Sequence, residues 1–269
     1  MSAHRFEDER FLRGNGRYVA DINRENQLYA KIVRSIHGHA KIINIDISDA
    51  LTVDGVCGIY VEDDLAKDGV GPLPCTTKFV AEQPLVVAER YALARDKVRY
   101  VGDPVALVLA ETEMAAQEAA ELVLVDYEAL PVLVNPVNSM RDGSPLIWSN
   151  VPKNIAYRFK KGEKESTAAA FDGAAHIVEL DIENNRVMAL PIEPRAGIGE
   201  YDPENDIMRL ICTAQGVHAI REQLAQSVFS IDEKKIQISA PDVGGGFGLK
   251  NFLFPEWVLL LWASKKQRR

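Results

Sequence analysis

The sequence predicts an α+β protein, because stretches with strand periodicity alternate along the chain with stretches of helical character. Residues 40–47 alternate apolar and polar side chains and are rich in β-branched residues, as in a half-buried strand. Residues 113–121 are dominated by alanine and glutamate and have high helix propensity. At 235–264 a strand-like segment, a glycine loop and an apolar helix follow one another directly. The rest of the chain is interpreted around this last stretch.

The first 131 residues show the strand, helix, strand order of one α/β unit. Residues 1–18 are polar and predict an extended arm. Residues 69–84 are rich in proline and glycine and predict a surface loop. Strands are expected at 28–33, 40–47, 55–61, 98–100, 104–110 and 122–128, and helices at 48–51 and 113–121.

A stretch with several prolines separates the two halves of the chain. We place a linker at 132–152, so that the predicted domains are 1–131 and 153–269. Trp257 to Ala263 are apolar on all sides, which predicts a helix buried all round, and we expect a further chain to cover it. The other elements expected here are a charged turn at 160–166, strands at 174–182, 208–213 and 236–238, and a helix at 216–228.

Composition argues against several classes of protein. The net charge of −8 and the pI near 5.3 disfavour a general nucleic-acid surface. Cys57, Cys75 and Cys212 form no C-x-x-C pair, so neither a disulfide framework nor a thiolate metal site is indicated. No other residues have metal-ligand spacing, and no metal site built by the protein alone is predicted. The amino terminus has no apolar stretch behind its charges, so a cytoplasmic location is expected.

Residues 244–248 form the loop Gly-Gly-Gly-Phe-Gly. Its glycines can adopt positive φ and let a ligand approach the backbone N–H groups, while Phe247 supplies a bulky wall. This favours an anionic or oxo-like ligand, with a tight turn between core elements as the structural alternative. The loop lacks the βαβ context of a dinucleotide fingerprint. It is not a Walker loop either, because Asn251 follows Lys250.

Three short motifs occur in order along the second half of the chain. They are Ile192-Glu193-Pro194-Arg195-Ala196, Thr213-Ala214-Gln215-Gly216-Val217-His218, and the segment DVGGGFGLKNFLFPE that begins at Asp242. Together they resemble motifs of the molybdenum hydroxylases, the family of xanthine dehydrogenase, aldehyde oxidase and aerobic carbon monoxide dehydrogenase. Further similarity at 10–18, 33–40 and 98–106 extends the resemblance over essentially the whole chain, and the motifs are most similar to the carbon monoxide dehydrogenase large chain.

The resemblance implies a small hammerhead domain at 1–131, followed by the first part of a mixed α/β molybdopterin-binding domain. It also implies a molybdenum–molybdopterin cofactor in its cytosine dinucleotide form. Asn251 stands where purine-oxidising relatives have a glutamate, which disfavours xanthine and places Asn251 in the substrate pocket. The family's catalytic glutamate has no counterpart here, so no catalytic residue is assigned. The cofactor-binding residues that the resemblance implies are Gln215, Gly245, Gly246, Phe247 and Gly248.

Considered without the resemblance, these side chains allow other roles. The amide of Gln215 suits contact with a metal oxo group, or it faces solvent at the start of a helix. Glu193 and Arg195 either form a structural ion pair or bond to the backbone, and these structural roles are favoured over contact with a substrate. His218 is interpreted as a packing or capping residue.

Two functional hypotheses follow. The first is the amino-terminal part of the molybdenum-cofactor subunit of an oxidoreductase of the carbon monoxide dehydrogenase or aldehyde oxidase type, which takes oxygen from water. This chain would need a chain supplying the carboxyl-terminal half, a flavin subunit and an iron–sulfur subunit, and it is expected to be inactive alone. The second is a non-catalytic module that keeps the fold and binds a pterin or nucleotide or assists assembly.

Overall fold

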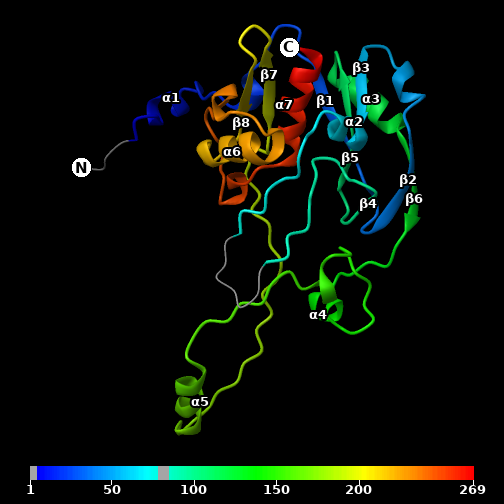
Figure 1. The fold of residues 1–269 in the computed structure, drawn as a ribbon. Coiled ribbons are helices and arrows are strands. Elements are labelled where there is room, and N and C mark those ends of the chain that lie inside the picture. The colour runs from blue at the N-terminus through cyan, green and yellow to red at the C-terminus, as the bar shows by residue number, and fades with distance from the viewer. Residues whose placement is uncertain (1–4, 78–84) are drawn as a thin grey trace. The chain divides into compact units, whose positions relative to one another are not determined.

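The computed structural model of the chain describes residues 5–77 and 85–269 (Figure 1). By internal contacts the chain forms two compact units. The sequence predicts two domains that are continuous along the chain, 1–131 and 153–269, whereas each of these units is made of separate segments. The predicted domain boundaries stay a prediction. The first unit contains Met1–Pro74, Glu89–Val132 and Ala189–Arg269, and the second contains Cys75–Ala88 and Leu133–Met188.

Two three-stranded antiparallel sheets form the amino-terminal part of the first unit. Helix α3 (Glu113–Leu122) packs against the first of them, and its N-cap Thr112 accepts a hydrogen bond from the Ala115 N–H at 3.1 Å. The main strands expected from the sequence are confirmed, although the one at 98–100 ends at Val98. In spatial order the first sheet is β1 (Tyr29–Arg34), β5 (Pro104–Ala110) and β3 (Val56–Val61), and the second is β4 (Lys97–Val98), β2 (Ala40–Asp46) and β6 (Leu124–Ala129).

A third sheet, in the order β7–β8–β9, positions the glycine loop. Strands β7 (Gly197–Asp202) and β8 (Ile207–Cys212) are antiparallel, whereas β8 and β9 (Ile236–Ser239) are parallel. The connection from β8 to β9 is α6 (His218–Gln223), which continues as a π-helical segment over Leu224–Phe229. After β9 comes the glycine loop and then α7 (Pro255–Gln267). The expected strands at 208–213 and 236–238 are confirmed, as are the helices expected at 216–228 and 257–263. The helix expected at 48–51 is instead a short 3-10 turn at Ala50–Thr52.

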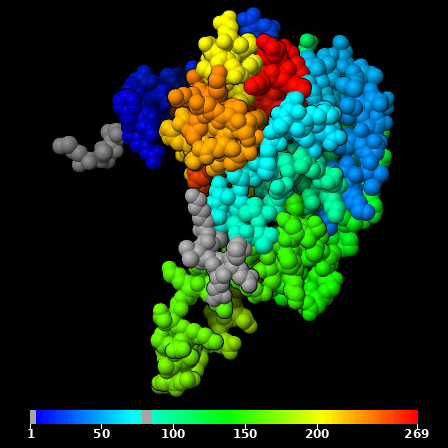
Figure 2. Space-filling view, viewed as in Figure 1, coloured from blue at the N-terminus to red at the C-terminus, as the bar shows by residue number. Residues whose placement is uncertain are grey.

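Helix α7 lies in the core of the first unit. Trp257, Leu261 and Trp262 are at most 4% exposed, and they share one apolar cluster with Leu107 of β5 and Leu210 of β8. In the space-filling view the red carboxyl-terminal end of the chain reaches the surface (Figure 2). The expectation that another chain must cover this helix is therefore wrong, because strands that precede it in the sequence already do so.

Strand β7 was not expected from the sequence, because its two glycines hide the apolar alternation. Gly197 and Gly199 lie against α7, and a Cβ at Gly197 would lie 3.0 Å from both Trp257 Cδ1 and Leu260 Cδ1. The missing side chains let the helix approach the strand closely. The same property that makes β7 hard to recognise allows it to pack.

The amino-terminal arm is partly helical rather than extended. Helix α1 (Asp8–Leu12) has acidic residues in its first turn, which favours helix formation, and Arg13 pairs with Glu9 at 2.6 Å. Residues 1–4 of the expected arm and 78–84 of the expected surface loop lie outside the described residues. Unexpected helix α2 spans Glu62–Lys67, and short 3-10 turns span Val19–Asp21, Ala50–Thr52, Pro152–Asn154, Glu233–Lys235 and Leu249–Asn251.

The second unit departs most from expectation. Helix α4 (Pro136–Ser139) lies inside the expected linker, where the Asn135 side chain caps it. Helix α5 (Lys164–Asp172) begins inside the expected charged turn. The strand expected at 174–182 is not formed, because that part of the chain has no strand partner among the described residues.

The three cysteines are free thiols. Cys212, at the end of β8, is fully buried, and burial raises its pKa to about 12. No helix within the described ranges is long and apolar enough to cross a bilayer.

Candidate functional site

The glycine loop meets two other segments of the first unit. Glu193 comes from the segment that precedes β7, Gln215 from the turn between β8 and α6, and Lys250 from the end of the loop itself. Lys250 is 57 residues from Glu193 and 35 from Gln215 in sequence. The fold thus brings together the three motifs that the sequence contains.

Lys250 connects these segments. Its side chain is completely buried, and its Nζ donates to the Glu193 carbonyl oxygen at 2.8 Å and to Glu193 Oε2 at 3.1 Å. The Lys250 N–H donates to Gln215 Oε1 at 3.2 Å, and the Gln215 N–H donates to the Lys250 carbonyl oxygen at 3.0 Å. A buried ammonium group is very costly unless it is paired and hydrogen-bonded. The position of the loop is therefore coupled to Glu193 and Gln215.

Glu193 also holds the first glycine of the loop. The Gly244 N–H donates to Glu193 Oε2 at 2.7 Å, and a Cβ at position 244 would lie 2.5 Å from the Glu193 Cβ. The second carboxylate oxygen, Oε1, is buried and has no hydrogen-bond partner among the described residues. A buried acceptor of this kind calls for a donor from water or a ligand.

Arg195 does not pair with Glu193. Its guanidinium lies over the Phe254 ring at 4.0 Å and 3.8 Å from Glu256 Oε1, which also accepts from Arg34 at 2.7 Å. The predicted ion pair between Glu193 and Arg195 is therefore wrong. The predicted bond to the backbone is confirmed for Glu193, whose carboxylate accepts from the Gly244 N–H. Arg195 instead helps to fix the start of α7.

The Gln215 side chain packs on Gly246. A Cβ at position 246 would lie 2.5 Å from Gln215 Oε1 and closer still to Cδ, so a side chain there would displace the amide. Oε1 is occupied by the Lys250 N–H, whereas Nε2 has no hydrogen-bond partner among the described residues, and Gln215 is exposed. The amide nitrogen is thus available to donate to a ligand.

Phe247 has an unusual backbone conformation. Its φ is +50°, in the left-handed region that bulky residues rarely adopt, and its side chain is 76% exposed. Gly245 and Gly248 on either side have φ of +95° and +83°. Backbone strain of this kind is concentrated at ligand clamps and active sites. The positive φ of Phe247 sets this loop apart from an ordinary turn, and no sequence pattern specifies it.

Two further motif residues lie outside this network. Asn251 ends the 3-10 turn that follows the loop, and His218 is the first residue of α6. Both are exposed. Within the described part of the chain, no group of three or more His, Cys, Asp or Glu residues could hold a metal ion.

The start of the loop is held by the amino-terminal arm. Asp242 accepts hydrogen bonds from Arg10, with Nη2 to Oδ1 at 2.6 Å, and from the Arg17 N–H at 2.7 Å. The Arg10 hydrogen bond, followed by that of Arg17, lowers the pKa of Asp242 to about 2. The arm thereby positions the chain two residues before the first glycine.

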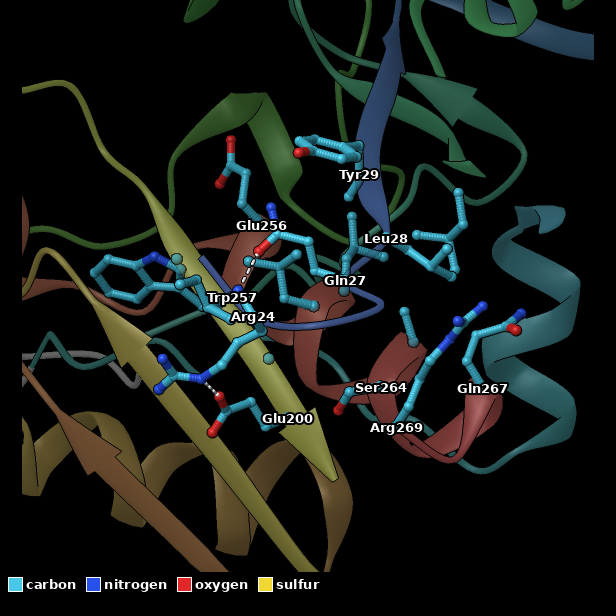
Figure 3. A pocket seen from close by; sticks show the side chains of 18 of the residues that line it. Arg24, Gln27, Leu28, Tyr29, Glu200, Glu256, Trp257, Ser264, Gln267 and Arg269 are labelled. Atoms are coloured by element: carbon cyan, nitrogen blue, oxygen red, sulfur yellow. Dashed lines mark hydrogen bonds and ion pairs between the residues drawn. The ribbon is translucent and has the colours of Figure 1, made fainter. Parts of the chain in front are cut away.

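A separate cavity of about 420 Å³ lies between β1, β7 and α7 (Figure 3). Leu28, Leu107 and Leu260 are among its apolar lining residues, and the ion pair between Arg24 and Glu200 lies beside it. Neither Gln215 nor any of residues 244–251 lines this cavity. It is therefore distinct from the glycine loop.

Comparison with known proteins agrees with this arrangement. A model described as "Aldehyde oxidase and xanthine dehydrogenase, a/b hammerhead domain" matches residues 13–131, and one described as "Molybdopterin cofactor-binding domain" matches residues 147–269. The chain belongs to the molybdenum hydroxylase family. Within that family it corresponds to part of the molybdopterin-binding large subunit, and the α+β fold class with its two successive domain types is confirmed.

Several molybdenum hydroxylases are similar over nearly the whole chain. The nicotine 6-hydroxylase large subunit of Paenarthrobacter nicotinovorans is 36% identical over 97% of this chain and 31% of its own length. The carbon monoxide dehydrogenase large chain of Afipia carboxidovorans is 33% identical over 97% of this chain and 32% of its own length. The solved structure of quinoline 2-oxidoreductase from Pseudomonas putida 86 superposes with a TM-score of 0.89 at 31% identity, covering 100% of this chain and 33% of that one. The chain thus spans about one third of the molybdenum hydroxylase large subunits that it matches.

The Gly246→Ala substitution tests the contact with Gln215. The added methyl group must displace the Gln215 side chain, so we expect the free energy of unfolding to fall by about 1–3 kcal/mol in urea titrations followed by tryptophan fluorescence. Gly216→Ala is the matched control, because a Cβ there meets no atom within 4 Å, and it should change stability by less than about 0.5 kcal/mol. Equal effects of the two substitutions would contradict the proposed contact.

The buried pair is tested by a double-mutant cycle. Lys250→Met leaves the Glu193 carboxylate buried without its cation, which should cost about 3–5 kcal/mol of unfolding free energy. Glu193→Gln alone should also destabilise, but the double variant should be more stable than the sum of the single effects predicts, with a coupling of about 1–3 kcal/mol. Additive effects in urea unfolding would show that the two side chains act independently.

The contact between the arm and Asp242 predicts a pH dependence. Because the pKa of Asp242 is about 2 in the folded chain and about 3.9 in an unfolded one, its charge stabilises the fold above pH 3.9, and this stabilisation is lost as pH falls through about 2. Asp242→Asn should therefore lower the melting temperature at pH 7, with a difference from wild type that shrinks between pH 4 and pH 2. Asp54→Asn, at an exposed position, is the control. A difference that stays constant over this range would rule out the charged contact.

Proposed function

We propose that the chain is the amino-terminal third of the molybdenum-cofactor-binding large subunit of an oxidoreductase that hydroxylates its substrate with oxygen from water. The junction of Gln215, Gly246 and Lys250 carries this proposal. There the Gln215 amide nitrogen, the backbone of Gly246 and the exposed Phe247 ring lie on one loop region. The buried ion pair between Lys250 and Glu193 holds this region in place. Membership of the family supports the class of cofactor, and the geometry supports the residues.

The loop fits a molybdenum–molybdopterin cofactor in its donor groups and in its shape. Gln215 can donate from Nε2 toward an oxygen ligand of the metal, and the exposed Phe247 ring can form one wall of the site. A Cβ at Gly246 would occupy space taken by the Gln215 amide, so glycine is required for this geometry. When bound, the cofactor supplies the two-electron redox chemistry. The residues proposed to hold it are Gln215, Gly245, Gly246, Phe247 and Gly248. The cytosine dinucleotide form of the cofactor is proposed from the family resemblance of the sequence motifs.

Asn251 bears on the substrate. Its neutral side chain is exposed beside the loop, at the position where the motif of purine-oxidising relatives has a glutamate. We therefore propose an aldehyde, a heterocycle other than a purine, or carbon monoxide as the substrate. The range reflects similar proteins named for nicotine 6-hydroxylation and for carbon monoxide dehydrogenation.

The proposed enzyme requires other chains. Relatives are named as large subunits or as a subunit of a dehydrogenase complex, which supports the presence of partner subunits. That these partners are a flavin subunit and an iron–sulfur subunit is proposed from the family resemblance of the motifs. The carboxyl-terminal part of the molybdenum domain, with the catalytic glutamate that the resemblance implies, would come from sequence beyond residue 269 or from a further polypeptide. Without this general base the 269-residue chain should show no turnover with aldehydes or carbon monoxide and an artificial acceptor. We also propose a location in the cytoplasm.

Metal and pterin analysis tests the cofactor assignment. We expect the chain, purified together with the products of its neighbouring genes, to contain stoichiometric molybdenum and pterin. Gln215→Ala and Gly246→Val should lose most of the metal while circular dichroism stays unchanged, because they remove the donor and fill the space beside it. Gly216→Ala should keep the metal. A folded complex without molybdenum would instead support the alternative function, a non-catalytic binding or assembly module.

A further inference from the structure

The segment that joins β9 to the glycine loop is attached to the amino-terminal arm, defined here as residues 5–18. Within the described part of the chain, Asp242 is the only one of residues 241–243 with a hydrogen bond to a distant segment, and its partners are Arg10 and Arg17. The arm thus contacts the chain immediately before the groups that would face a ligand of the loop.

This contact fixes both the side chain and the backbone of Asp242. Arg10 makes two parallel hydrogen bonds, from Nη2 to Oδ1 at 2.6 Å and from Nη1 to Oδ2. The Arg17 N–H donates to Oδ2 at 2.7 Å, and the Asp242 N–H donates to the Arg17 carbonyl oxygen at 3.1 Å. A planar guanidinium that bonds both carboxylate oxygens sets their orientation as well as their distance. Asp242 therefore has little freedom to rotate or shift while the arm is in place.

The arm depends on this contact more than on apolar burial. None of residues 5–18 is buried, and Phe6 and Leu12 are 103% and 87% exposed, so the arm gains little from the hydrophobic effect. The side chains of Arg10 and Asp242 are 43% and 13% exposed, so their attraction is screened less than that of a fully exposed pair. Docking of the arm and the position of Asp242 thus depend on each other.

We propose that Arg10 is a positioning residue for the cofactor loop, which acts through Asp242 by fixing the backbone at the start of the loop. This inference rests on the proposed function, because it gives Arg10 a part in holding the ligand of that loop. The loop start then has two supports, since the Gly244 N–H donates to Glu193 Oε2. A strained residue such as Phe247 keeps its conformation only where the surrounding structure fixes it, and the arm supplies one of these constraints.

Amide exchange in the 269-residue chain tests the positioning without any cofactor. In Arg10→Ala the amides of Asp242 and Gly245, the second of which donates to the Val243 carbonyl oxygen at 2.9 Å, should exchange at least about tenfold faster. The Leu210 amide in β8 should keep its rate. Arg10→Lys keeps the charge but not the planar fork, and it should restore part of the lost protection.

Arg13→Ala is the matched control. Arg13 lies on the same arm, but it pairs with Glu9 and makes no ion pair with the loop region in the described part of the chain. Its substitution should therefore leave the exchange of the Gly245 amide unchanged.

Two results would overturn the proposal. One is an unchanged exchange rate of the Gly245 amide in Arg10→Ala, which would show that Glu193 alone fixes the start of the loop. The other is an equal acceleration of the Gly245 and Leu210 amides, which would show that the arm contributes only to overall stability.

Molybdenum content connects the positioning with the cofactor. In the complex purified with the products of the neighbouring genes, Arg10→Ala should hold at least about fivefold less molybdenum than wild type after dialysis, and Arg13→Ala should match wild type. A wild-type complex without molybdenum would contradict the proposed function, whereas the exchange rates of the 269-residue chain would still decide whether Arg10 positions the loop. Equal molybdenum in wild type and Arg10→Ala would overturn the role of Arg10 and leave the proposed function intact.

Discussion

The buried charge of Lys250 constrains the whole region around the glycine loop. Taking an ammonium ion out of water costs several kcal/mol, which is offset here by the Glu193 carboxylate and carbonyl oxygens. Because Glu193 also accepts from the Gly244 N–H, and the Lys250 backbone exchanges hydrogen bonds with Gln215, one ion pair fixes three separate segments. A shift of any segment would break contacts in the other two.

Both ends of the loop are attached to rigid structure, whereas its middle is open. Asp242 is held by Arg10 and Arg17 of the arm, and the loop leads into α7, which is buried between sheets of the first unit. Between these anchors the Phe247 side chain and the Gln215 amide nitrogen remain accessible. Ligand-binding groups positioned by a rigid surrounding shell are characteristic of functional sites. The cavity of about 420 Å³ beside β7 is lined by Arg195 and Glu256 of the motifs, but not by Gln215 or by the loop residues 244–251.

Local signals in the sequence were sufficient for the periodic elements and for the motifs, but not for contacts between distant segments. The alternation in β2 and the helix propensity of α3 are properties of neighbouring residues, and both elements formed as expected. The pairing of Lys250 with Glu193 spans 57 residues and follows no period, so only the fold reveals it. The strand expected at 174–182 failed for a different reason, since a strand needs a partner and none of the described residues provides one.

Amide exchange in the Lys250→Met variant, at a temperature where it stays folded, tests whether the Lys250 ammonium organises the loop. If it does, the amides of Gly244 and residue 250, which donate to Glu193 Oε2 and Gln215 Oε1, should lose their protection while the Leu210 amide in β8 keeps its own. Unchanged protection of the Gly244 amide in the folded variant would contradict it, because the loop would then hold its position without the buried charge.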